Sequence, residues 1–255
     1  MFVRFVRLRV REGQEQAFAD WYRSRVIPEL SALSACAFAG LLAPWRSEDH
    51  LSLTIWRHAG GANAYERSGL YHQLLREAEP MLSPRTEWTM RPGDGEADER
   101  TDAKIREIPS EGFVLEAGES EARRLGKDLD SAFVRIVSVR VAPDRIGEFV
   151  AAYSERILPT LREQPGFRGG LLAEDGSSDG AFLSITLWGR EEDATRYEMS
   201  GAFAQLTDEV KDTFSPLYTW PTALAGARDR DPRLDAPKVA SYQLVMGKRL
   251  GYDGR

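Results

Sequence analysis

Hydrophobic periodicity and an internal repeat indicate an α+β protein: two ferredoxin-like βαββαβ domains that form an intrachain pseudo-dimeric α+β barrel. Residues 2–10 return at 133–141 with six of nine positions identical. Residues 51–84 return at 183–216 with fourteen of thirty-four positions identical and no gap. Solenoid units span roughly 20–50 residues, whereas this period is about 131 residues, the length of a whole small domain. The chain is therefore predicted to hold two copies of one domain.

Each repeat shows strand and helix patterns in the same order. In the first repeat, apolar spacing predicts strand, helix, strand, strand, helix and strand at 2–10, 14–32, 37–44, 50–57, 60–80 and 85–91. Pro28 and Pro159 occupy equivalent positions of the first predicted helix. Both helices are expected to bend or end near these prolines, because proline has no backbone N–H to donate and clashes with the preceding turn.

The βαββαβ order leaves one face of each four-stranded sheet without helices. The attached second copy can cover that face, so we expect the two sheets to pack face to face. Two extra strands are predicted near 112–118 and 240–247, and we expect each to cross to the other half and lock the pair. The predicted organisation is a first domain at 1–91, a linker at 92–131, a second domain at 132–221 and a tail at 222–255.

Composition narrows the classes of function. A net charge of −6 and a pI near 5.3 argue against a nucleic-acid partner, because phosphate neutralisation needs a basic surface. No apolar run approaches the roughly 18–20 residues of a membrane span, so no membrane partner is expected. The one cysteine, Cys36, cannot form an internal disulfide. A cytoplasmic location is the expectation from these features.

The third strand of each repeat, LSLTIW (51–56) and LSITLW (183–188), carries candidate site residues. Alternation separates an aliphatic face from a polar face that ends in an indole. The polar face holds Ser52, Thr54 and Trp56 in the first repeat and Ser184, Thr186 and Trp188 in the second. We expect the aliphatic side to meet the helices and the polar side to line a cavity between the two sheets. In the alternative, both tryptophans only plug the barrel ends, each with a partner for its N–H.

LSLTIW, a short link and the pattern AxxYExSGxYxQL (62–74) resemble the antibiotic-biosynthesis-monooxygenase (ABM-like) family of dimeric α+β barrels. The resemblance covers 2–91 and 132–220. It implies an oxidoreductase without a bound cofactor, which oxygenates an aromatic polyketide or quinone-type small molecule with molecular oxygen. Trp56 and Arg76 match the family pattern, whereas Ser52 replaces a polar amide and Ala62 replaces a tyrosine. The haem-degrading branch requires residues that neither repeat has, so haem cleavage is not expected.

The resemblance gives the first repeat a set of expected roles. Arg76 is expected to hold a substrate anion, and Trp56 to stack on its ring. His72 or Tyr65 would relay a proton, and Ser52 would orient a substrate hydroxyl. The other expected substrate-binding residues are Thr54, Tyr71, Ser184, Trp188 and Tyr197. The first repeat is favoured because it holds all three histidines, although each histidine is alternatively an ordinary surface residue.

Two other functions fit the same scaffold: a non-catalytic barrel that binds a small ligand, and an isomerase or cyclase that uses acid–base groups without oxygen. The replacements at Ser52 and Ala62 favour the first. No HxH or CxxC pair supports a metal site, so no metal is expected. The expected assembly is a monomer that acts as a pseudo-dimer, with a homodimer of such units as the alternative.

Overall fold

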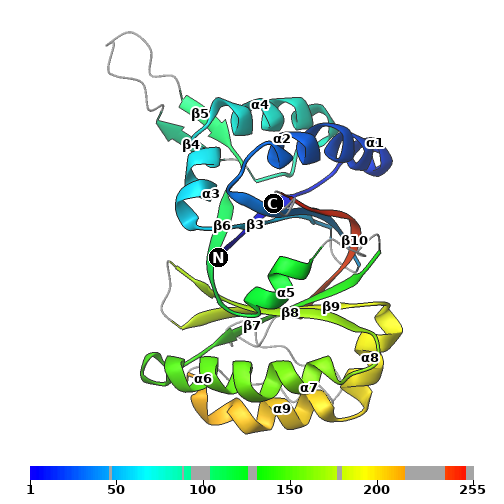
Figure 1. The fold of residues 1–255 in the computed structure, drawn as a ribbon. Coiled ribbons are helices and arrows are strands. Elements are labelled where there is room, and N and C mark those ends of the chain that lie inside the picture. Colours follow the sequence, from blue (N-terminus) through cyan, green and yellow to red (C-terminus); the bar gives the residue numbers. More distant parts are fainter. Residues whose placement is uncertain are drawn as a thin grey trace, which may run out of the picture.

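The two repeats close into one antiparallel barrel with helices outside it (Figure 1). The computed structural model describes residues 1–45, 48–87, 89–92, 104–125, 131–176, 180–215 and 239–250. The barrel order is β1-β3-β2-β10-β7-β9-β8-β6, closed between β6 and β1. The strands are β1 (Phe2–Leu8), β2 (Cys36–Pro44), β3 (His50–Trp56), β6 (Ser110–Ala117), β7 (Phe133–Arg140), β8 (Phe167–Asp175), β9 (Ala181–Trp188) and β10 (Val239–Arg249). The prediction that the halves join through their uncovered sheet faces is confirmed.

The helices form two outer layers, one for each repeat, on opposite sides of the barrel (Figure 1). Those of the first repeat are α1 (Glu15–Trp21), the π-helix η1 (Tyr22–Val26), α2 (Ile27–Ser31), α3 (Ala59–Glu66), α4 (Gly69–Ala78) and η2 (Glu79–Met81). Those of the second are η3 (Pro143–Arg145), α6 (Ile146–Ala152), the π-helix η4 (Tyr153–Ile157), α7 (Leu158–Arg162), α8 (Glu191–Met199), α9 (Ala202–Val210) and η5 (Lys211–Thr213). A further short helix, α5 (Glu119–Arg124), follows β6.

Proline shapes the first helix of both repeats. Pro28 and Pro159 each lie at the start of an α-helix, immediately after a π-helical segment. Because proline cannot donate the usual hydrogen bond to the preceding turn, the helix widens there to an i→i+5 pattern. The interruption expected near the two prolines is therefore present in both repeats.

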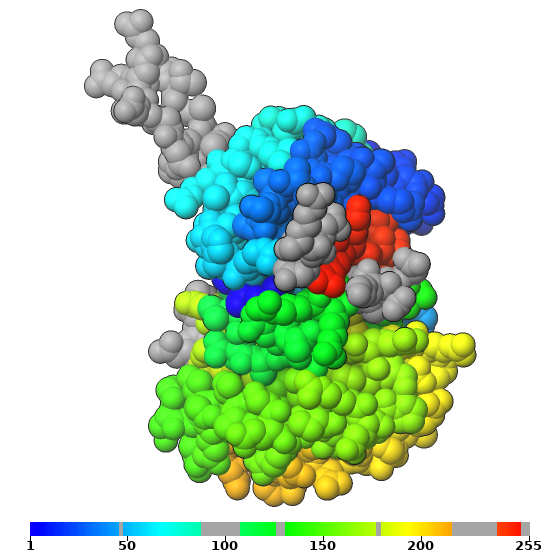
Figure 2. Space-filling view, viewed as in Figure 1, coloured from blue at the N-terminus to red at the C-terminus, as the bar shows by residue number. Residues whose placement is uncertain are grey.

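Two strands are shared between the repeats. β6 pairs with β1 of its own repeat and with β8 of the other, and β10 pairs with β7 and with β2. In the space-filling view, the red surface of β10 lies between the blue first repeat and the green second repeat (Figure 2). Each shared strand is the fourth strand of its own βαββαβ unit and an edge partner of the other unit.

The prediction that residues 85–91 form the fourth strand of the first sheet is wrong. The nearest strand, β4 (Thr89–Pro92), pairs with β5 (Lys104–Glu107) in a separate two-stranded sheet outside the barrel. β1 has only two edges, which β3 and β6 already occupy, so no edge is left for residues after α4. Of the predicted tail, 222–238 and 251–255 lie outside the described residues, as do 93–103 and 126–130 of the predicted linker.

The expected orientation of the third strand is also wrong. Leu53, Ile55 and their counterparts in β9 pack in the barrel interior with residues of both repeats. Trp56 instead belongs to the core between the sheet and the helices of the first repeat. The barrel interior is enclosed by strands, so it takes aliphatic side chains, whereas the helix side offers tyrosine hydroxyls to the polar row. No helix in the described part of the chain is long and apolar enough to cross a membrane.

Candidate functional site

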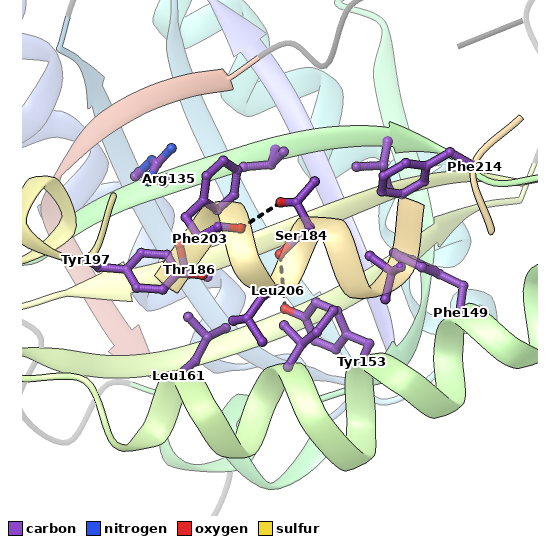
Figure 3. Close-up of a pocket in the computed structure, with 15 residues that line it drawn as sticks. Arg135, Phe149, Tyr153, Leu161, Ser184, Thr186, Tyr197, Phe203, Leu206 and Phe214 are labelled. Carbon is purple, nitrogen blue, oxygen red and sulfur yellow. Dashed lines mark hydrogen bonds between the residues drawn. The ribbon is translucent and has the colours of Figure 1, made fainter. Parts of the chain in front are cut away.

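A cavity lies in the second repeat, between the outer face of β7 and β9 and the helices that cover it (Figure 3). The volume that the centre of a water molecule can reach is about 70 Å³. Most of its wall is apolar, from Val137 and Phe149 to Leu206 and Phe214. The polar lining residues are Arg135, Tyr153, Ser184, Thr186, Tyr197 and Thr207. An apolar cavity with a few converging polar groups is typical of a small-molecule site.

Tyr153 and Ser184 form the polar centre of this cavity (Figure 3). Their hydroxyl oxygens are 3.0 Å apart, and the Tyr153 hydroxyl also donates to the Leu171 carbonyl at 3.3 Å. Burial raises the pKa of Tyr153 to about 12. The phenol is therefore protonated at neutral pH and can orient a ligand, but it is not a base. Tyr153 is the first residue of π-helix η4, and π-helical turns often occur at functional sites.

Trp188 lies next to the cavity and contacts two of its lining residues. Its indole N–H donates to the Thr186 hydroxyl at 3.0 Å, and its ring stacks on Tyr197 with centroids 5.1 Å apart. Burial also raises the pKa of Tyr197, so this hydroxyl too remains protonated at neutral pH. The indole is fully buried and does not line the cavity itself. Trp188 thus positions Thr186 and Tyr197, which do line the cavity.

One ion pair lies at the edge of the cavity. The buried guanidinium of Arg135 pairs with Glu198 of α8 and lies over the ring of Phe203, 5.5 Å from its centroid. The Glu198 side chain is 43% exposed. Arg135 lies at the opposite end of the cavity from Phe149 and Phe214 (Figure 3). This end combines a buried cation with a partly solvated carboxylate.

The first repeat holds the same constellation at equivalent positions. Tyr22 and Ser52 are joined at 2.8 Å, Trp56 donates to Thr54 at 2.9 Å, and Trp56 stacks on Tyr65 at 5.4 Å. Burial raises the pKa of Tyr22 and Tyr65. These aromatic residues pack in one apolar cluster. Ile108 closes it, since the Tyr71 hydroxyl donates to the Ile108 carbonyl at 3.1 Å.

Three of the four expected catalytic residues, Trp56, Tyr65 and His72, are linked by ring contacts through Tyr71. Trp56 and Tyr65 stack on each other within the helix-side core, and His72 is buried beside Tyr71 at 5.6 Å. Arg76 lies exposed on α4. The expected substrate-binding residues Ser52, Thr54 and Tyr71 lie on the helix side of the first repeat, and Ser184 and Tyr197 line the cavity of the second. The structure thus divides the expected set between two helix-side clusters.

Sequence reasoning missed two pairs of site residues. Tyr22 and Tyr153 hydrogen-bond to the serines of the hydroxyl row, and Arg4 and Arg135 lie opposite its threonines on the neighbouring strand. The internal repeat contained the signal, because both residue types are identical at equivalent positions. A buried arginine in an otherwise apolar strand needs a partner, which marks the position as unusual.

Residues 132–208 match the family model described as antibiotic biosynthesis monooxygenase (ABM). This segment is an ABM domain. It runs from the start of β7 into α9 and contains every polar lining residue of the cavity. The first repeat has the same architecture and the same hydroxyl row. Comparison with curated protein sequences gives no match.

Solved structures with this fold span nearly the whole chain. A candidate monooxygenase from Lactobacillus acidophilus has a TM-score of 0.65 at 9% identity, over 98% of this chain and 96% of that one. A candidate monooxygenase from Fusobacterium nucleatum has a TM-score of 0.63 at 10% identity, over 97% and 94%. An anthrone oxidase-like protein has a TM-score of 0.54 at 12% identity, over 99% and 94%. At these identities the likeness concerns the fold alone.

The described part of the ABM domain and its partner repeat has no group of three or more His, Cys, Asp or Glu side chains placed to hold a metal ion. The ABM cavity instead offers neutral hydroxyl groups and one guanidinium. Such a set can hold a hydroxyl or an oxyanion of a ligand by hydrogen bonds and charge.

Proposed function

We propose that the second repeat binds a weakly acidic aromatic hydroxyl compound of the anthrone or naphthol type, and that the protein oxygenates it directly with O2. The observation that carries this proposal is the apolar cavity with Tyr153 and Ser184 at its polar centre and Arg135 at one end. The ABM match over 132–208 supports oxygenation as the reaction class. The expected role of Arg76 passes to Arg135, because Arg76 is exposed and Arg135 lines the cavity.

The chemistry requires little from the protein beyond holding an anion. In 1,8-dihydroxyanthrone, the ring CH2 opposite the carbonyl loses a proton to give a delocalised anion that can transfer an electron to O2. The CH2 becomes C=O, one oxygen atom enters the product, and the other leaves as water with the two hydrogens. Arg135, Tyr153 and Ser184 would stabilise the anion as it forms, and the apolar wall would exclude water. One such donor contributes about 3 kcal/mol.

A ligand-binding barrel without turnover is the second candidate function. It is favoured by the small inner volume, about 70 Å³, and by the raised pKa of Tyr153, which removes that residue as a base. The isomerase or cyclase alternative needs the same site without oxygen. Oxygen consumption separates these three functions.

Oxygen uptake with 1,8-dihydroxyanthrone as the probe tests the proposal. Tyr153→Phe and Ser184→Ala are expected to lower kcat/KM at least about tenfold, because each removes one oriented hydroxyl. Tyr22→Phe is the matched control, since it removes the equivalent hydroxyl from the first repeat, and kcat/KM is expected to stay within about twofold. Thermal unfolding of all variants checks that the fold is intact.

The outcomes distinguish the candidates. Equal losses in Tyr153→Phe and Tyr22→Phe would contradict a site in the second repeat. Probe binding without oxygen uptake would replace the proposal by the ligand-binding barrel. Conversion of the probe without oxygen uptake would favour the isomerase or cyclase.

A further inference from the structure

The cavity of the second repeat adjoins a larger groove on the outside. The inner volume of about 70 Å³ is well below the roughly 300–1,000 Å³ typical of pockets that enclose drug-sized ligands. The groove has a volume of about 290 Å³. Its wall comes from both repeats: Trp45 of the first repeat, and Phe133, Glu191, Ala194, Thr195, Glu198, Val239 and Ser241. A polycyclic ligand therefore needs more room than the inner cavity offers.

Arg135 is the residue that the two spaces share. It lines both the inner cavity and the outer groove, whereas its partner Glu198 lines the groove only. The ion pair therefore lies at the boundary between them. Moving the partly exposed Glu198 side chain into solvent would open this boundary and leave the buried guanidinium facing the groove.

In the first repeat, the equivalent ion pair between Arg4 and Glu66 is held by additional hydrogen bonds. Arg4 pairs with Glu66 at 2.8 Å and also donates to Asn63 at 3.1 Å and to the Ala62 carbonyl at 2.7 Å. Ser110 of β6 adds a hydrogen bond of 2.5 Å to the other oxygen of Glu66. Four contacts thus hold the pair in place, and Arg4 is buried.

The second repeat lacks these supports. Thr195 stands at the position of Asn63, and Val239 of β10 at the position of Ser110. Within the described ranges, Glu198 is held by its contact with Arg135 alone. The Glu198 side chain is 43% exposed, against 27% for Glu66. A partly solvated carboxylate gains little from such a pair and can exchange at small cost.

We propose that Arg135 is the anion-recognition residue of the site, and that an aromatic ligand with an acidic group displaces Glu198 and extends from the inner cavity into the outer groove. The exchange keeps a buried cation paired, which a neutral ligand cannot do. The acid is a carboxylate or an acidic phenol or enol, and the aromatic body lies along Trp45. Trp45 is 43% exposed, lies edge-on to Phe133 at 5.7 Å and is held by Glu191 at 2.9 Å.

This inference rests on the proposed inner binding cavity, but its test needs no turnover. Isothermal calorimetry at pH 7.5 would compare 1-naphthoate with the neutral analogue 1-naphthalenemethanol. Glu198→Gln frees Arg135 from its competing carboxylate, so the affinity for 1-naphthoate is expected to rise about tenfold while that for the alcohol stays within about twofold. Glu192→Gln removes the same charge from an exposed position of the same helix that does not line the groove, and it should change naphthoate affinity less than about threefold.

A second variant is designed to strengthen the ion pair between Arg135 and Glu198 instead of removing it. Val239→Ser places the hydroxyl that locks Glu66 in the first repeat beside Glu198, so it should weaken naphthoate binding. Equal effects of Glu198→Gln and Glu192→Gln would overturn the inference, as would equal gains for acid and alcohol, or no binding of 1-naphthoate by any variant. If the naphthoate pattern appears without oxygen uptake, the anion site stands and oxygenation fails. If oxygen uptake depends on Tyr153 but the naphthoate pattern is absent, only the anion site fails.

Discussion

Tyr153 and Ser184 illustrate how single side chains give this barrel its chemistry. Both hydroxyls sit on an apolar surface, and each satisfies the other. A ligand hydroxyl that enters the cavity can join this pair without leaving a buried polar group unpaired. The equivalent pair in the first repeat, Tyr22 and Ser52, packs instead under Tyr71 and Ile108. The same residue types thus serve a cavity in one repeat and a core in the other.

The environment of His50 predicts how the stability of the fold depends on pH. It is buried against Phe18, its Nδ1 has no hydrogen-bond partner among the described residues, and burial lowers its pKa despite nearby Glu15 and Asp49. Below the ordinary histidine pKa of about 6.5, the unfolded chain therefore binds a proton that the folded chain resists. Stability should be full above about pH 7 and fall as the pH drops towards the lowered pKa of His50.

The second repeat supplies the matched variants. Phe182 occupies the equivalent position and contacts Phe149 as His50 contacts Phe18. His50→Phe should therefore flatten the loss of stability between pH 7 and pH 5, and Phe182→His should steepen it. Urea unfolding at both pH values measures the difference. A wild-type slope that His50→Phe leaves unchanged would contradict the assignment.

The sequence predicted the row of polar side chains on the third strand, but not the tyrosine and arginine side chains that lie beside it. The family resemblance assigned Arg76 to hold an anion beside the polar row, yet that side chain lies exposed on α4. Arg135 reaches the row from the neighbouring strand, opposite Thr186 in the pairing of β7 with β9. Spacing along one segment does not reveal a neighbour that arrives through strand pairing.

At the level of elements, the third strand shows what alternation leaves open. A period of two separates Ser52, Thr54 and Trp56 from Leu51, Leu53 and Ile55 without saying which side faces the helices. The structure turns the aliphatic side into the barrel, where both repeats contribute, and the hydroxyl side towards the tyrosines of the first helix. The cavity consequently lies outside the barrel.

The junction between β6 and α5 depends on Gly118, which has a positive φ of 86°. A Cβ there would lie 2.2 Å from the Gly170 carbonyl oxygen of β8. Gly201 is the matched control, with φ of 82° and no atom within 4 Å of an added Cβ. Gly201→Ala should cost about 1 kcal/mol of unfolding free energy from backbone strain alone.

Gly118→Ala adds a backbone clash between the two repeats, so the expected cost is about 3 kcal/mol. Chemical denaturation of both variants measures the difference. Similar losses for the two substitutions would show that the approach of β6–α5 to β8 is not close in solution.

At the level of the whole molecule, strand sharing makes the two repeats one folding unit. β6 and β10 each bond to strands of both halves, and the barrel interior is lined from both. Neither repeat can pair the outer edges of its sheet or cover its inner face without the other. We therefore expect a single cooperative unfolding transition.

Calorimetry with one substitution in each repeat tests this. Leu53→Ala and Ile185→Ala remove buried side chains from the barrel interior, and each should cost about 2–5 kcal/mol. Both should shift the same transition to lower temperature. Two transitions, each moved by only one substitution, would show that the repeats unfold independently.

From the amino-acid order alone came the duplication, the βαββαβ succession, the joining of two uncovered sheet faces, the proline interruptions and the polar row on the third strand. These are local or repeated patterns, and periodicity records them directly. Folding in three dimensions settled which face of that strand turns inward, which segment serves as fourth strand, and which arginine lies beside the hydroxyls. Those features depend on barrel closure and on pairing between distant strands, where the energy comes from neighbours that no single stretch of chain contains.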